Sequence, residues 1–250
     1  MTGTRIPRAA APRVPPPRAA EGRPAGNRPP EDRPAGNRPP EQRPAGNRPP
    51  EQRPNAARTV RAGVHELRGP GPAALRYPAG DLLVVTGLPG SGKSTLMRRS
   101  VHAPLVDSQL VREEYAAWLP GRLPYALYRP LARLAHYRRL RRAVLDGGEL
   151  AVHDCGTLPF VRFWLVRAAA RQGRRVHLLL LDVDPEEARA GQRRRGRWVS
   201  RYAFARHRGA AARLRGLLLG AGRPPAGCAS AVVLDRGAAR ALREIDFSAS

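Results

Sequence analysis

Nine consecutive residues have the types and spacing needed to hold a polyphosphate. They are Gly87, Leu88, Pro89, Gly90, Ser91, Gly92, Lys93, Ser94 and Thr95. This order fits the G-x-x-x-x-G-K-[ST] spacing of a P-loop, or Walker A motif. Glycines lack a Cβ, so the backbone can turn several N–H groups toward one anion. We therefore expect the nine residues to bind ATP with Mg²⁺, Lys93 to act on the β- and γ-phosphates as a catalytic residue, and the Ser94 hydroxyl to bind the metal.

Lys93 is the only lysine in the chain. The other 44 of its 45 basic residues are arginine. An ammonium is a compact point charge, whereas a guanidinium is a planar fork, so the two are not interchangeable. The one position where P-loop chemistry needs an ammonium is the position that has it. The alternative, a glycine-rich turn without a ligand, does not explain this placement.

A P-loop needs a strand before it and a helix after it. The apolar run 82–85 enters the loop, and residues 94–99 suit a helix whose positive dipole end favours an anion. Later apolar runs alternate with helical stretches. Further strands are expected at 103–106, 150–152, 176–181 and 231–234, with helices between them and a last helix at 237–245. The alternation predicts an α/β fold of the P-loop NTPase class, with a five-stranded parallel sheet and helices on both faces.

Two of the expected helices have apolar stripes. In the helix before Gly147 the members of the stripe are Leu127, Leu131, Leu134, Leu140 and Val144. In the helix of residues 160–170 they are Phe160, Trp164 and Leu165. Residues at helical spacing usually face the core, so we expect both stripes to be buried. For the first stripe, a groove for a partner is the alternative.

Aspartates follow several of the predicted strands. Ligands of such sheets bind beyond the carboxyl ends of the strands, which makes these residues candidates. Asp107 follows the second strand, where a carboxylate could orient an acceptor hydroxyl and take its proton. Asp154 follows the third, where an acid could hold Mg²⁺ beside the loop hydroxyl. Each could instead cap a helix. Asp182 or Asp184 follows the fourth, and Asp184 is expected to cap the next helix.

An arginine cluster follows that helix, from Arg193 to Arg197. Guanidinium groups on a segment that closes over the phosphates would neutralise charge in a loose transition state and exclude water. We therefore expect Arg195 and Arg197 to be catalytic residues of a lid. A solvated basic face is the alternative.

The first 57 residues differ in composition from the rest. Fifteen of the 27 prolines lie before residue 55, and a ten-residue repeat begins at Glu21. The repeat has no large apolar residue to bury, which predicts a disordered, partly polyproline II arm at 1–57. A solvated arm and a docking tether both remain open. We expect a transition segment at 58–80 and an ATP-binding, kinase-like domain at 81–246.

The formal net charge of +25 ordinarily indicates a nucleic-acid or membrane partner. The excess is almost entirely arginine in an Ala-, Gly- and Pro-rich chain, which high-GC codon usage produces, so we expect only weak, non-specific polyanion binding. Cys155 and Cys228 form no disulfide framework, and His153 beside Cys155 is not expected to bind metal. Because the chain also lacks a signal peptide and a long apolar run, we expect a cytoplasmic protein without a membrane partner.

The pattern of motifs resembles a known family. Its elements are the loop 87–95, the strand-end Asp107 with Arg112 after it, the strand-end Asp154, and Asp184-Pro185 before an arginine-rich segment. They look like the small P-loop kinases related to polynucleotide kinase and zeta toxin, often grouped with AAA-family ATPases. The resemblance covers about residues 80–245. It implies a five-stranded sheet, ATP with Mg²⁺, a catalytic aspartate at Asp107 and a lid at Arg193 to Arg197.

Two functions are consistent with these residues. The first is an ATP-dependent kinase that transfers the γ-phosphate of ATP to a hydroxyl of a small molecule or a nucleic-acid end. The second is a nucleotide-responsive binding protein or regulatory ATPase whose basic surface engages nucleic acid or an acidic partner. Aromatic residues are only 5% of the chain, which weighs against stacking on single-stranded nucleic acid.

Overall fold

The computed structural model describes residues 56–118, 125–153, 159–196 and 199–249. Nearly all of the predicted arm therefore lies outside the described residues. The elements, in chain order, are β1 (Arg58–Thr59), β2 (Gly63–Leu67), β3 (Ala74–Pro78), β4 (Leu82–Gly87), α1 (Lys93–Ser100), β5 (Leu105–Val106), α2 (Ser108–Trp118), α3 (Tyr125–Asp146), β6 (Leu150–His153), α4 (Pro159–Ala170), β7 (Val176–Leu181), α5 (Pro185–Arg194), α6 (Arg201–Ala221), β8 (Cys228–Leu234), α7 (Arg236–Ala241) and β9 (Glu244–Ala249).

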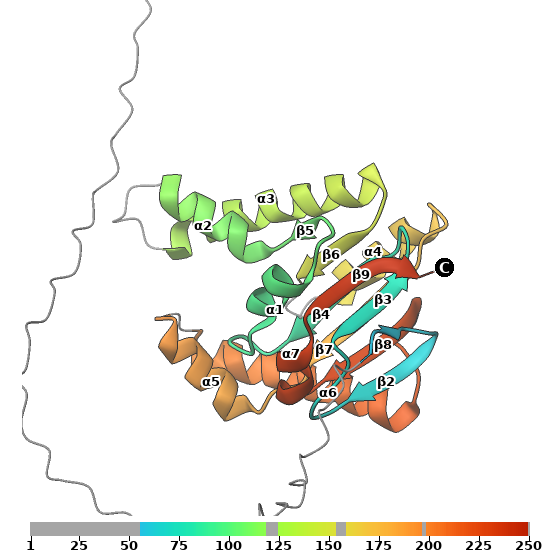
Figure 1. Ribbon diagram of the computed structural model, residues 1–250. Coiled ribbons are helices and arrows are strands. Elements are labelled where there is room, and N and C mark those ends of the chain that lie inside the picture. Colours follow the sequence, from blue (N-terminus) through green and yellow to red (C-terminus); the bar gives the residue numbers. More distant parts are fainter. Residues whose placement is uncertain (1–55, 119–124, 154–158, 197–198, 250) are drawn as a thin grey trace, which may run out of the picture. The chain divides into compact units, whose positions relative to one another are not determined.

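The main sheet has six parallel strands in the order β2-β8-β7-β4-β6-β5 (Figure 1). All five predicted strands are in it, and the P-loop NTPase type of α/β fold is confirmed. The predicted number of strands is one too low, because β2 pairs with β8 from Gly63↔Ser230 to Leu67↔Leu234. As an edge strand with half-exposed side chains, β2 lacks the continuous apolar run of the inner strands.

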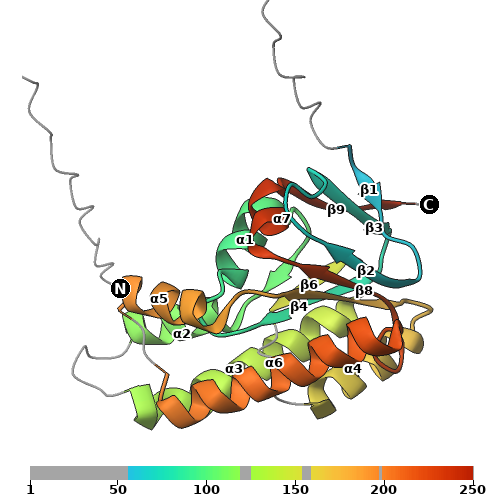
Figure 2. The same cartoon turned by 90° about the horizontal axis from the view of Figure 1, so that it is seen from below.

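Two cores lie on opposite faces of the sheet, because side chains alternate along each strand. In β4, Leu83 and Val85 belong to one core, and Leu82 and Val84 to the other. Helices α1 and α7 and a small parallel sheet, β1-β3-β9, cover the first face; α3, α4 and α6 cover the second (Figure 2). The sheet is thus buried on both sides and presents its strand ends to ligands.

The prediction for the C-terminus is wrong in part. The expected helix 237–245 stops at Ala241, and residues 244–249 form β9, which pairs with β3. Ile245 and Phe247 are buried, which fits the two-residue period of a strand. So short an alternation gives a weaker signal than the preceding alanine-rich run, which favours a helix.

The predicted stripe of α3 is wrong in its first half. Leu127, Leu131 and Leu134 are 66%, 57% and 55% exposed. The buried row of this helix instead has four-residue spacing and includes Tyr128, Ala132, Leu140 and Val144. In α4, likewise, Phe160 is 63% exposed, whereas Val161 and Leu165 are buried. Packing against neighbouring helices, rather than the size of single side chains, decides which face turns inward.

Candidate nucleotide-binding and phosphoryl-transfer site

The loop between β4 and α1 folds around the ammonium of Lys93. This side chain is 5% exposed, and its Nζ donates hydrogen bonds to the carbonyl oxygens of Gly87 at 2.9 Å and Leu88 at 2.7 Å. Gly92 precedes α1 with a φ of 102°, a left-handed conformation that favours glycine. A buried ammonium therefore lies at the N-terminus of a helix, and both attract an anion.

Two loop hydroxyls are buried. Ser91 and Ser94 are 1% and 2% exposed, and the Ser91 Oγ has no hydrogen-bond partner among the described residues. Buried polar atoms are normally partnered, so this orphan fits a site that a polar ligand completes. The Ser94 hydroxyl is an oxygen donor of the kind that Mg²⁺ prefers. Asp154, the predicted second metal ligand, lies outside the described residues.

Helix α5 packs directly on the P-loop. The Gln192 side chain donates from Nε2 to the Pro89 carbonyl at 2.9 Å, and its Oε1 accepts from the Val199 N–H at 3.3 Å. A small separate core joins the loop to α5 and α6 through Leu88, Ala188 and Phe204. The helix that leads into the predicted lid is thus fixed to the phosphate-binding loop.

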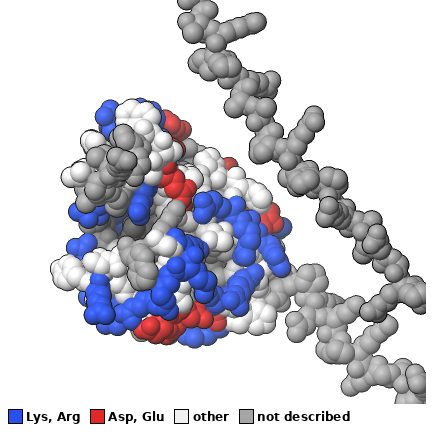
Figure 3. Space-filling model, turned by 90° about the vertical axis from the view of Figure 1, so that its left-hand side faces the viewer, with Lys and Arg blue, Asp and Glu red and all other residues white. Residues whose placement is uncertain are grey.

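The arginine cluster begins at the end of α5. Arg195 donates from Nη2 to the Thr95 Oγ1 at 2.9 Å, so its guanidinium lies against the P-loop. Arg193, Arg194 and Arg195 are all exposed, and Arg197 lies outside the described residues. Figure 3 shows Lys and Arg side chains gathered on the side of the molecule that carries α2 and α5. A polyanionic ligand would approach this side through a positive field.

A second guanidinium beside the loop is that of Arg236, which we did not predict. It follows β8; its Nε lies 3.2 Å from the Glu187 Oε2, and its Nη1 would be 3.9 Å from a Cβ placed on Gly92. Ligands of such sheets bind beyond the carboxyl ends of the strands. Because Arg236 lies at such an end, the same expectation that marked the aspartates could have identified it from the sequence.

Asp107 lies at the end of β5 with its carboxylate buried. Its Oδ1 accepts hydrogen bonds from the Gln109 N–H at 2.8 Å and the His153 Nδ1 at 2.5 Å. Burial alone would raise the pKa of Asp107, but the hydrogen bond and charge of His153, the hydrogen bond from the Gln109 N–H and the nearby Ser94 hydroxyl lower it to about 2. The group is therefore ionised at neutral pH. The structure brings Asp107 near Ser94. Because its carboxylate accepts from the Gln109 N–H, Asp107 also caps α2, which is the alternative role considered from the sequence.

His153 is a member of this site that sequence reasoning considered only as a metal ligand. Its ring is 6% exposed. The β5–β6 register pairs Val106 with Val152, which places the next residues, Asp107 and His153, side by side. The contact between Asp107 and His153 depends on two strands that are far apart in the sequence. The one sequence feature that indicates it is the expectation that both strands end at the same edge of the sheet.

Other strand-end acids have structural partners. Asp184 accepts a hydrogen bond from the Glu186 N–H at 2.7 Å and caps α5, as predicted. Asp182 pairs with Arg215 at 2.6 Å. Both roles hold helices in place, whereas Asp107 interacts with Ser94 of the P-loop.

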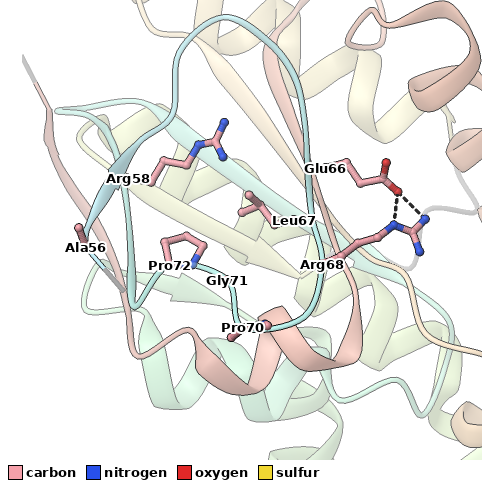
Figure 4. Close-up of a pocket in the computed structure, with 8 residues that line it drawn as sticks. All are labelled: Ala56, Arg58, Glu66, Leu67, Arg68, Pro70, Gly71 and Pro72. Carbon is pink, nitrogen blue, oxygen red and sulfur yellow. Dashed lines mark hydrogen bonds and ion pairs between the residues drawn. The ribbon is translucent and has the colours of Figure 1, made fainter. Parts of the chain in front are cut away.

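A cavity of about 380 Å³ lies apart from this site (Figure 4). It is lined by Ala56, Arg58, Glu66, Leu67, Arg68, Pro70, Gly71 and Pro72. Within it, Arg68 donates from Nε to the Glu66 Oε1 at 2.7 Å. Strand β2, which supplies Leu67, is three strands away from β4, and no lining residue belongs to the P-loop.

A model of a protein family described as an AAA domain matches residues 82–215, more than half of the chain. The chain belongs to this family. The matched part of the AAA domain includes the P-loop, Asp107, His153 and α5. No curated protein sequence matches the chain. In the described part of this AAA domain, no helix is both long and apolar enough to cross a bilayer.

Several solved structures are similar to this AAA domain. One, from the PezAT chromosomal toxin–antitoxin system of Streptococcus pneumoniae, is 16% identical, has a TM-score of 0.40 and aligns over 48% of this chain and 53% of its own. A Chloroflexus aurantiacus protein is 18% identical and has a TM-score of 0.42; the alignment covers 63% of this chain and 85% of that protein. The Deinococcus radiodurans tunicamycin resistance protein is 18% identical and has a TM-score of 0.35; the alignment covers 55% of this chain and 81% of that protein. The alignment spans about half of the first of these chains, and such low TM-scores say nothing about the reaction.

Proposed function

We propose that this AAA domain is an ATP-dependent kinase that transfers the γ-phosphate of ATP to a hydroxyl of a small molecule or a nucleic-acid end. The observation that carries the proposal is Asp107, a buried, ionised carboxylate near Ser94 whose Oδ2 has no hydrogen-bond partner among the described residues. Binding a nucleotide does not require a carboxylate oxygen that lacks a hydrogen-bond donor, whereas an acceptor hydroxyl needs such an oxygen as its partner.

The reaction uses this oxygen to hold the acceptor. A bond forms between the acceptor oxygen and the γ-phosphorus, and the bond from that phosphorus to the β,γ-bridging oxygen breaks, releasing ADP. The acceptor proton goes to the Asp107 Oδ2. In a loose transition state the proton leaves late, so a carboxylate of low pKa serves mainly to orient the hydroxyl. Lys93 and Arg195 stabilise the negative charge on the phosphates.

Mg²⁺ would be held by the Ser94 hydroxyl and by Asp154. When bound, the metal would neutralise charge on the β- and γ-phosphates. The proposed reaction needs a compartment that supplies ATP, and we propose the cytoplasm, with which the low cysteine content agrees.

Phosphate transfer from labelled ATP to a panel of hydroxyl acceptors tests the function. Lys93→Ala removes a charged donor and should weaken binding of a fluorescent ATP analogue by roughly 10- to 100-fold. Asp107→Asn should bind the analogue normally but transfer phosphate about 10²- to 10⁴-fold more slowly. Transfer at the wild-type rate by Asp107→Asn would contradict the proposed role of this carboxylate.

The second candidate function is nucleotide-dependent binding of a polyanion, which the exposed arginines of α5 favour. Contact with six phosphates predicts a slope of about −5 when log affinity for DNA is plotted against log salt concentration. Affinity that does not change with salt would rule out such contacts.

A further inference from the structure

The two oxygens of the Asp107 carboxylate have different surroundings. Oδ1 accepts from the His153 Nδ1 at 2.5 Å and the Gln109 N–H at 2.8 Å. Oδ2 is buried and has no hydrogen-bond partner within 3.5 Å in the described part of the chain, although the Ser94 hydroxyl lies near enough to help lower the pKa of Asp107. An ionised carboxylate can only accept hydrogen bonds, so the Nδ1 of His153 carries the hydrogen. One oxygen is therefore held by two donors, whereas the other is buried without a hydrogen-bond partner among the described residues.

A second buried Asp–His pair in the same sheet provides an internal comparison. At the amino ends of the strands, the Asp81 Oδ2 lies 2.9 Å from the His177 Nε2, and its Oδ1 accepts from the Arg175 N–H at 2.8 Å. The other ring nitrogen of His177 lies 2.7 Å from the Ser230 Oγ. Every polar atom of this pair is partnered, as expected of a structural pair.

The pair at the carboxyl ends of the strands differs in this respect. Among the described residues, neither the Asp107 Oδ2 nor the His153 Nε2 has a hydrogen-bond partner. Leaving buried polar atoms unpaired costs stability, so such atoms call for an explanation. The difference coincides with location, because ligands of parallel α/β sheets bind at the carboxyl ends.

The strand registers hold His153 between the candidate base and the P-loop strand. Val106 pairs with Val152 across β5 and β6, and Val85 pairs with His153 across β4 and β6. His153 thus joins the strand that ends at Asp107 to the strand that enters the loop. A shift of this ring would move the carboxylate relative to the bound phosphates.

We propose that His153 is a positioning residue for phosphoryl transfer: its Nδ1–H fixes the Asp107 Oδ1 so that Oδ2 faces the acceptor hydroxyl. This inference rests on the proposed kinase function. His153 does not touch the reacting atoms. It acts through the direction of a carboxylate, and small errors of direction slow such reactions strongly.

Kinetics of ATP turnover with water as the acceptor test this role without a known substrate. His153→Leu keeps an apolar side chain of moderate size but removes the donor, and should lower kcat about 10- to 100-fold with an unchanged KM for ATP. In His153→Asn an amide N–H can replace Nδ1–H, so this variant should recover most of the loss. Equal losses in the two variants, or a change confined to KM, would overturn the proposal.

The Asp81–His177 pair, in which every polar atom has a partner, supplies the matched control. His177→Leu removes a buried imidazole from the other end of the same sheet, so it should lower the free energy of unfolding without lowering kcat. If His177→Leu and His153→Leu reduce kcat equally, general destabilisation explains both. The positioning role is then excluded.

A measurement on the nucleotide-free protein needs no activity at all. The ¹⁵N shifts of the His153 ring should show hydrogen on Nδ1, and Asp107→Ala should abolish that preference. A wild-type ring with no preference for Nδ1–H would overturn the inference. Failure of the wild-type protein to transfer phosphate to any acceptor, water included, would overturn the kinase function and with it this role, whereas turnover unaffected by His153→Leu would overturn the positioning role alone.

Discussion

Gly90 of the P-loop and Gly191 of α5 touch backbone to backbone. A Cβ placed on Gly191 would lie 2.3 Å from the Gly90 carbonyl oxygen, and a Cβ on Gly90 would lie 2.1 Å from the Ala188 carbonyl oxygen. Neither glycine can gain a methyl group without moving the loop or the helix. The geometry of the phosphate-binding loop therefore depends on where α5 lies.

Gly191→Ala should weaken ATP binding although alanine favours helices. Moving α5 off the loop costs about 1–3 kcal/mol, so we expect roughly tenfold weaker binding of a fluorescent ATP analogue in a titration. The control is Gly216→Ala in α6, where nothing lies within 4 Å of an added Cβ. That variant should bind normally and be stabilised by about 0.5–1 kcal/mol. Normal ATP binding by Gly191→Ala would mean that the contact is unimportant.

Arg195→Ala should lower the rate of transfer more than it weakens ATP binding. The guanidinium bonded to Thr95 is placed to stabilise charge that grows in the transition state, and we expect kcat to fall at least about 10²-fold. Steady-state kinetics with saturating ATP measure this. The control is its neighbour, because Arg194→Ala removes the same charge from a side chain that is also exposed. Equal effects would show that only net charge matters.

The Asp81–His177–Ser230 chain should make stability depend on pH. Burial lowers the pKa of His177 although Asp81 opposes the shift, so below about pH 6.5 the unfolded chain binds more protons than the folded one. Stability should therefore fall with decreasing pH, by at most about 1.4 kcal/mol per pH unit from this group.

Urea unfolding between pH 7.5 and pH 5 measures this dependence. The wild type should lose more stability over that range than His177→Leu, whose lost hydrogen bonds also cost about 1–3 kcal/mol at every pH. Parallel profiles for the wild type and His177→Leu would show that His177 does not titrate in this range.

Two leucines of α3 should differ sharply in their contribution to stability. Leu140→Ala leaves a cavity in the core and should cost about 2–5 kcal/mol of unfolding free energy. Leu131→Ala, in the exposed half of the helix, should change it by less than about 0.5 kcal/mol. Denaturant titration measures both. A large cost at Leu131 would show that a partner covers this face.

Whether the sequence predicts a feature of the site depends on how far apart along the chain the contacting residues lie. The P-loop and the Asp184 cap depend on neighbouring residues, so local patterns predict them. The contact between Asp107 and His153 spans 46 positions and depends on strand register, which no local pattern specifies. Edge strand β2 was missed for the same kind of reason, since pairing with β8 rather than composition makes it a strand. The catalytic roles of Arg195 and Arg197 stay predictions.

The solitary lysine gives this protein a built-in chemical reporter. Lys93 is 5% exposed and donates hydrogen bonds to two carbonyl oxygens, and it is the only lysine among the 250 residues. An amine-selective acylating reagent therefore has one side-chain target in these residues, and it lies inside the phosphate-binding loop. The rate of acylation at Lys93, followed by mass spectrometry, would report on occupancy of the loop without any engineered probe.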